Sequence, residues 1–254
     1  MEKIAATLDI SVIALILAVA MLAAWNVGKR MGERLLRKGG VEPSKFDDAS
    51  MALLGLLLAF TFGMSITKHD QRRLAVVADS NAIGDFYTCA SLLKEPTRTN
   101  LQAVIRQYAQ LRRDLTRGEL RSSNLESALA KFDQLHIRMT ELVAQALSDG
   151  TPIAVSLTNT LNQVTSNQAS RLAAYKDRLP TSIVILLFAC AIVTALLIGR
   201  EQGVANSSDI AGTLSFILLV SIAVYVTLDL NRPERGLIRV SQEPIERLLA
   251  SMPK

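Results

Sequence analysis

The sequence predicts an all-α membrane protein with four transmembrane helices and a helical cytosolic region between the second and third spans. Four long apolar stretches lack Asp, Glu, Lys, Arg and His, namely residues 10–28, 49–67, 179–199 and 210–228. Half of the 254 residues are hydrophobic and 20% are charged, whereas soluble domains carry about 25% charged residues. At about 1.5 Å of rise per residue each stretch forms a helix of ~28–32 Å, the thickness of the hydrocarbon layer.

The first stretch is expected to remain in the protein as a membrane anchor. It follows Met1-Glu2-Lys3, which has no net positive charge, and it is longer than the roughly 7–15 apolar residues of a secretion signal. Trp25, Lys29 and Arg30 close it with side chains typical of a membrane interface. The chain has only two cysteines, so a disulfide-stapled scaffold is excluded.

The second stretch carries a stripe of small residues that predicts helix packing. Gly55, Ala59 and Gly63 recur every four residues and share one face, and small residues let helix backbones approach closely in lipid. The third stretch follows Pro180 and the fourth ends at Asp229, with only about ten residues between them. We expect these two spans to form a tight hairpin.

The intervening segment, 68–178, has helical periodicity. The predicted organisation is a first transmembrane hairpin (1–67), this helical region (68–178), a second transmembrane hairpin (179–230) and a cytosolic tail with a short helix (231–254). Uncharged polar residues crowd positions 159–168. They suit hydrogen bonding between helices or a water-filled interior, and equally a solvated helix face.

The distribution of cations predicts the orientation. The termini and the segment 68–178 together hold 21 Lys and Arg, and the loops at 29–48 and 200–209 hold seven. The positive-inside rule therefore favours cytoplasmic N- and C-termini in a multi-pass cell (inner) membrane protein, although the 29–48 loop is itself rich in cations.

Known catalytic patterns are missing. The sequence has no phosphate-binding glycine loop, and its two histidines, His69 and His136, are too far apart to form a helical metal pair. We predict that the protein is not an enzyme and has no catalytic residue, cofactor, metal site or nucleic-acid partner. The expected partners are membrane lipid, small inorganic ions and further copies of the chain.

Several motifs resemble a known family. They are Gly55-Leu-Leu-Leu-Ala-Phe-Thr-Phe-Gly63, then Arg72-Arg73-Leu-Ala-Val-Val-Ala-Asp79-Ser-Asn81-Ala-Ile-Gly84-Asp-Phe-Tyr87, Arg171 ahead of Pro180, and Leu228-Asp-Leu-Asn-Arg-Pro233-Glu-Arg-Gly236-Leu-Ile-Arg-Val-Ser-Gln-Glu-Pro244. Together they resemble the bestrophin-like family of bacterial membrane proteins and cover roughly a third of the chain in the family's order.

The resemblance implies an ion channel built as a ring of identical subunits, usually five, with the second span lining the pore. The family's narrow apolar rings match Leu56 and Phe60, with Ala52 at the third place, where the small side chain departs from the pattern. The calcium-binding acidic cluster of some bestrophins is not supported, because the tail after Asp229 offers few carboxylates amid three arginines.

The residues alone offer another pore face. Thr61, Ser65, Lys68 and Arg72 form a polar stripe on the second span and its extension. This stripe and the Leu56–Phe60 face are alternatives, with a slight preference for the apolar one because apolar rings gate by dewetting.

Asp79 and Asn81 follow among apolar neighbours. A carboxylate in such surroundings needs a partner, and Arg72, Arg73 and Arg171 are candidates, so we expect a structural ion pair in preference to an ion-binding site.

Two functions follow from these observations. The first is a homo-oligomeric ion channel with a weak preference for anions, since segment 68–178 carries a net charge of +4 from fifteen cations and eleven carboxylates. The alternative is a membrane sensor or scaffold whose helical region docks a partner without conducting ions.

Overall fold

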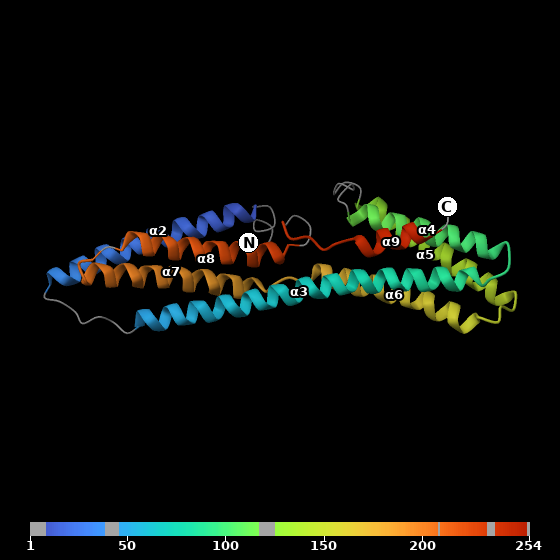
Figure 1. Cartoon of the computed structure of the whole chain (residues 1–254), viewed down its shortest axis with the longest axis horizontal. Coiled ribbons are helices and arrows are strands. Elements are labelled where there is room, and N and C mark those ends of the chain that lie inside the picture. Colours follow the sequence, from blue (N-terminus) through green and yellow to red (C-terminus); the bar gives the residue numbers. More distant parts are fainter. Residues whose placement is uncertain (1–8, 39–45, 117–124, 208, 233–236, 253–254) are drawn as a thin grey trace. The chain divides into compact units, whose positions relative to one another are not determined.

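The computed structural model describes residues 9–38, 46–116, 125–207, 209–232 and 237–252, and every regular element among them is a helix (Figure 1). This confirms the predicted all-α class. The helices are α2 (Ile10–Arg37), α3 (Phe46–Ser91), α4 (Thr97–Thr116), α5 (Leu125–Ser148), α6 (Ala154–Lys176), α7 (Thr181–Val204), α8 (Ile210–Leu230) and α9 (Glu243–Ser251). Within the described residues, four helical stretches are long and apolar enough to cross a membrane: Ile10–Arg37, Asp48–Ser91, Ala154–Val204 and Ile210–Leu230.

The chain divides into two compact units. Unit 1 consists of Met1–His69 and Arg178–Ile238, and unit 2 consists of Asp70–Asp177 and Arg239–Lys254. The helix in the tail, α9, thus belongs to unit 2, whereas sequence analysis treated 231–254 as a segment of its own.

Unit 1 is built from α2, α7, α8 and the first half of α3. Its core is apolar, as expected for helices whose other faces meet lipid; its largest buried side chains include Leu17, Met21, Leu54, Leu187 and Val224. Within this unit α2 packs along both α7 and α8.

The closest helix contact in unit 1 is made by four glycines. A Cβ added to Gly28 or Gly32 of α2 would lie 2.0 Å from the backbone oxygen of Leu196 or 2.1 Å from that of Arg200 on α7. A Cβ on Gly199 or Gly203 of α7 would meet the oxygens of Trp25 and Lys29 at 2.1 and 2.2 Å. The contact is reciprocal, and both residue numbers rise along it, so the two helices are parallel and touch backbone to backbone.

Unit 2 packs the second half of α3 with α4, α5, α6 and α9. Its core contains Phe86, Tyr108, Phe132 and Ile245, and the rings of Tyr108 and Phe132 meet edge to face with centroids 5.3 Å apart. On α6 the buried residues Leu157, Leu161 and Val164 follow helical spacing. The polar residues of 159–168 lie mostly on its exposed or half-buried positions.

Candidate functional site

The face of α3 that points away from the core of unit 1 carries Ala52, Leu56 and Phe60. Leu56 is 54% exposed and Phe60 is 64% exposed, and Ala52 is exposed too. At about 100° per residue this stripe lies ~160° from the buried face of the same helix, which carries Leu54 and Thr61. A second copy of the chain can therefore reach Leu56 and Phe60 without any repacking of the subunit.

The polar stripe lies largely inside the subunit. Thr61 is 2% exposed, Ser65 0% and Arg72 4%, while Lys68 is half-buried. The Thr61 hydroxyl donates to the backbone oxygen of Leu57, 2.8 Å away. Of the two faces considered from the sequence, only the apolar one is open in the single subunit.

The small-residue stripe on α3 also faces outward. No atom lies within 4 Å of a Cβ added to Gly55 or Gly63, and Ala59 is exposed. The stripe is therefore not used for close packing inside the subunit, where Gly28, Gly32, Gly199 and Gly203 make that contact instead. The four-residue spacing of these glycines on α2 and α7 is visible in the sequence, but we did not predict the contact between the two helices from it.

The fully buried carboxylate of Asp79 is the centre of a polar cluster in unit 2. Its Oδ2 accepts from Arg171 Nη1 at 2.6 Å and from Arg112 Nε at 3.1 Å, and its Oδ1 accepts from Arg112 Nη2 at 3.3 Å. Arg171 also donates to Gln242 Oε1 at 2.9 Å. The cluster therefore joins α3, α4, α6 and the residue that precedes α9.

Tyr108 extends this cluster. Its hydroxyl accepts from Arg112 at 3.2 Å and donates to Gln168 Oε1 at 2.8 Å. The Arg112 guanidinium also lies 5.0 Å from the ring centroid of Phe132. Burial raises the pKa of Tyr108 to about 12. The phenol therefore stays protonated at physiological pH and keeps its hydrogen bond to Gln168.

The structure thus pairs Asp79 with Arg171, one of three partners considered from the sequence, and adds Arg112. Arg72 donates to the backbone oxygens of Ala174 and Asp177 at 3.1 and 2.7 Å. Asn81 is exposed and lies outside the cluster of bonds around Asp79. We did not predict Arg112 as a partner of Asp79, because it interrupts an apolar pattern in the sequence. Its position one turn after Tyr108 nevertheless places it on the buried face of α4.

Asp229, at the end of α8, is 2% exposed and accepts hydrogen bonds from the backbone. Its two carboxylate oxygens accept from the amides of Leu237 and Ile238 at 3.0 and 2.9 Å. The stretch 233–236, which contributes to the family resemblance, lies outside the described residues. In the part of the chain that the structure describes, no group of three His, Cys, Asp or Glu side chains could hold a metal ion.

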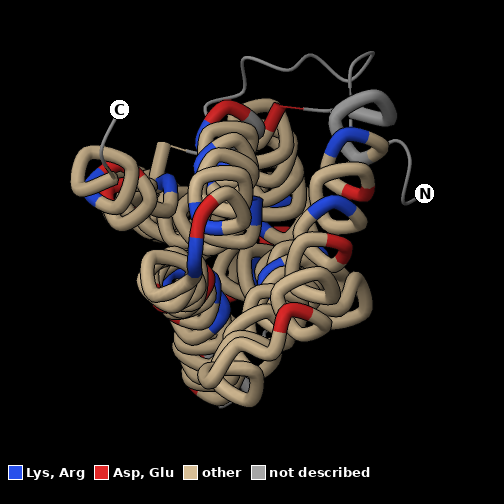
Figure 2. The backbone as a smooth tube through the Cα atoms, turned by 90° about the vertical axis from the view of Figure 1, so that its right-hand side faces the viewer, with Lys and Arg blue, Asp and Glu red and all other residues tan. Residues whose placement is uncertain are grey.

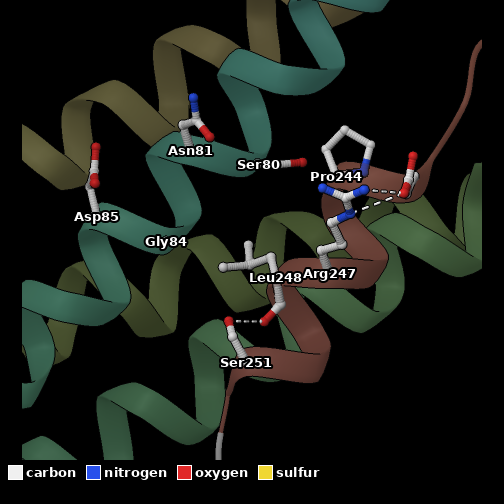
Figure 3. Close-up of a pocket in the computed structure, with 9 residues that line it drawn as sticks. Ser80, Asn81, Gly84, Asp85, Pro244, Arg247, Leu248 and Ser251 are labelled. Atoms are coloured by element: carbon white, nitrogen blue, oxygen red, sulfur yellow. Dashed lines mark hydrogen bonds and ion pairs between the residues drawn. The ribbon is translucent and has the colours of Figure 1, made fainter.

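A pocket of about 650 Å³ lies between α3 and α9 in unit 2 (Figure 3). It is lined by Ser80, Asn81, Gly84, Asp85, Glu243, Pro244, Arg247, Leu248 and Ser251. Several of its polar groups are already engaged: Arg247 Nε donates to Glu243 Oε1 at 3.0 Å, and the Ser80 hydroxyl donates to the oxygen of Val76 at 2.9 Å. The pocket lies between two helices, and the residues that line it do not indicate a particular ligand or reaction.

Comparison with known protein families gives a match over most of the chain. A family model described as the Bestrophin-like domain covers residues 14–245, which takes in most of both units. No curated protein and no solved structure matches.

Proposed function

Since this chain belongs to the bestrophin-like family, we propose that it is the subunit of a homo-oligomeric ion channel whose pore is lined by α3. The outward face of α3 is the observation that carries this proposal. Leu56 and Phe60 are held on the side of the helix opposite the subunit core, so several copies can direct them toward a common axis. Rings of apolar side chains at such an axis form a constriction that opens or closes by wetting.

The assembly is proposed to contain five copies, as the family resemblance implies. The excess of cations on the side of the termini and unit 2 favours a cell (inner) membrane location with that side in the cytoplasm. In Figure 2, blue (Lys and Arg) and red (Asp and Glu) segments lie interspersed on the end of the chain that faces the viewer. Because the charges are mixed, the small net positive charge favours anions only weakly, and the pore residues set the selectivity.

The proposal is tested by ion flux from vesicles that contain the purified chain. Leu56→Ala and Phe60→Ala are expected to change the flux severalfold, because each replaces a side chain of the proposed constriction. Leu219→Ala is the matched control, because Leu219 is an exposed apolar residue of α8. Native mass measurement gives the number of subunits in the same preparations.

An assembled protein that passes no ions would contradict the proposal and favour a sensor or scaffold. Equal effects of Leu56→Ala and Leu219→Ala on ion flux would be compatible with a channel but would contradict the proposal that α3 lines its pore.

A further inference from the structure

The end of α2 projects cations beyond the membrane. The helix has 28 residues, so it is about 42 Å long and exceeds a hydrocarbon layer of ~30 Å by roughly eight residues. The surplus is the stretch 30–37, which contains Arg30, Arg34 and Arg37 and a single carboxylate, Glu33. All three arginines are exposed, and within the described part of the chain they form no hydrogen bond or ion pair.

These arginines lie on the face of α2 that turns away from the helix bundle. Gly28 and Gly32 mark the face that touches α7. At about 100° per residue, each of the three arginines falls within ~40° of the direction opposite to those glycines. The guanidinium groups are therefore directed outward.

The same outward face is apolar for most of the membrane span. Its exposed residues are Val12, Ile16, Val19 and Ala23, followed by Asn26 near the end of the span. In a membrane the apolar side chains meet acyl chains, and the arginines follow about two to four turns beyond Ala23 along the same line. Lipids that cover the apolar part of this face therefore place their headgroups beside Arg30, Arg34 and Arg37.

The geometry points to a binding site for anionic phospholipid headgroups on the outward face of α2, formed by Arg30, Arg34 and Arg37. Guanidinium groups bind phosphate oxygens in a forked geometry. Cations near an anionic membrane surface strengthen binding by about fivefold each. A second copy of the chain fits this face poorly, because it would have to cover three arginines in a stretch, 30–37, whose one carboxylate is Glu33. The inference does not depend on ion conduction.

Lipid retention by the full-length protein tests the site. The purified chain in neutral detergent is titrated with phosphatidylglycerol or phosphatidylcholine, and bound lipids are counted by native mass measurement. The wild type is expected to retain more phosphatidylglycerol than phosphatidylcholine. The triple variant Arg30→Gln, Arg34→Gln and Arg37→Gln is expected to lose about fivefold in phosphatidylglycerol retention per removed cation at low salt.

The matched control removes three exposed cations elsewhere, with Arg73→Gln, Lys94→Gln and Lys131→Gln, and should bind as the wild type does. The charge-keeping variant Arg30→Lys, Arg34→Lys and Arg37→Lys should recover part of the retention. Unchanged retention in the Gln triple variant, or an equal loss in the control, would overturn the inference. So would a change in subunit number with unchanged lipid retention, because that result would identify another copy of the chain as the occupant.

Discussion

Replacing Gly199 by alanine places a methyl group against the backbone of α2. The new Cβ would lie 2.1 Å from the oxygen of Trp25, and real Cβ atoms essentially never approach closer than 3.0 Å. The helices must therefore separate by about 0.9 Å, because a backbone oxygen cannot rotate away as a side chain can.

The energetic effect follows from that separation. A gap of 0.5–1 Å forfeits about a quarter to a half of each dispersion contact along the interface, and overpacking of this kind typically costs ~1–3 kcal/mol. The Cα–H···O contacts that glycine makes with the facing oxygens add about 0.5–1 kcal/mol each when they are lost. We expect Gly199→Ala to lower the free energy of unfolding by ~2–4 kcal/mol.

The single tryptophan gives a direct assay. Trp25 is the only tryptophan in the chain, and its Nε1 donates to Gln202 Oε1 of α7 at 3.1 Å. Its fluorescence during unfolding in detergent micelles therefore reports on the contact between α2 and α7. Gly199→Ala should shift both the emission of the folded protein and the unfolding midpoint.

The matched control is Gly55→Ala, which adds the same methyl group to another membrane helix where nothing lies within 4 Å. It should leave the Trp25 signal and the subunit's stability unchanged, or raise stability by up to about 1 kcal/mol through helix propensity. Equal effects of the two substitutions would refute the packing argument.

Three further predictions concern buried polar groups. Asp79→Asn leaves two arginines without their carboxylate and should lower the free energy of unfolding by ~3–5 kcal/mol. The control Glu141→Gln, at an exposed ion pair, should lower it by no more than about 1 kcal/mol. Denaturant titration compares the two variants, and a similar loss in both would count against a structural role of Asp79. The pKa of Tyr108 in the folded protein, about 12, exceeds its ordinary value of 10.0. The free energy of unfolding should therefore be unaffected below pH ~10 and fall by roughly 2–3 kcal/mol as the pH rises to ~12. Tyr108→Phe should abolish this fall, and an unchanged alkaline profile in that variant would show that Tyr108 does not cause it. Asp229→Ala removes the acceptor of two partly buried backbone amides. Because Leu237 and Ile238 are exposed to solvent, the variant should destabilise unit 1 by no more than about 1–3 kcal/mol per amide; the same titration measures this loss, and no loss at all would contradict a structural role of Asp229.

The fold class could be predicted because its signal is one-dimensional. A span needs about 20 consecutive, predominantly apolar residues, and four apolar, uncharged runs of the sequence each meet that condition. No knowledge of the neighbours of a span is needed for this step. Fold class and family likeness were accordingly accessible from the residues.

Partner choice could not be predicted in the same way, because it depends on which helix faces meet. Two four-residue glycine patterns exist on α2 and α7 and another small-residue pattern on α3, and all of them suit close packing in lipid. Only the three-dimensional arrangement shows that the first two oppose each other while Gly55 and Gly63 face outward. Similarly, the need of Asp79 for a cation was evident, but Arg112 comes from a helix whose register against α3 is a tertiary property.

The hydroxyl stripe of α3 shows why polarity alone is a poor guide to a water-accessible face in a membrane helix. A threonine can satisfy its hydroxyl on its own helix, as Thr61 does with Leu57 at 2.8 Å and Thr227 does with Ala223 at 2.7 Å. Once that bond is made, the side chain packs as an apolar group, so its burial costs little. An aqueous lining is therefore better identified from what the subunit leaves exposed than from hydroxyl content. By that criterion Leu56 and Phe60 are among the exposed residues of α3 that a pore between subunits could use, whereas the buried Thr61 and Ser65 are not.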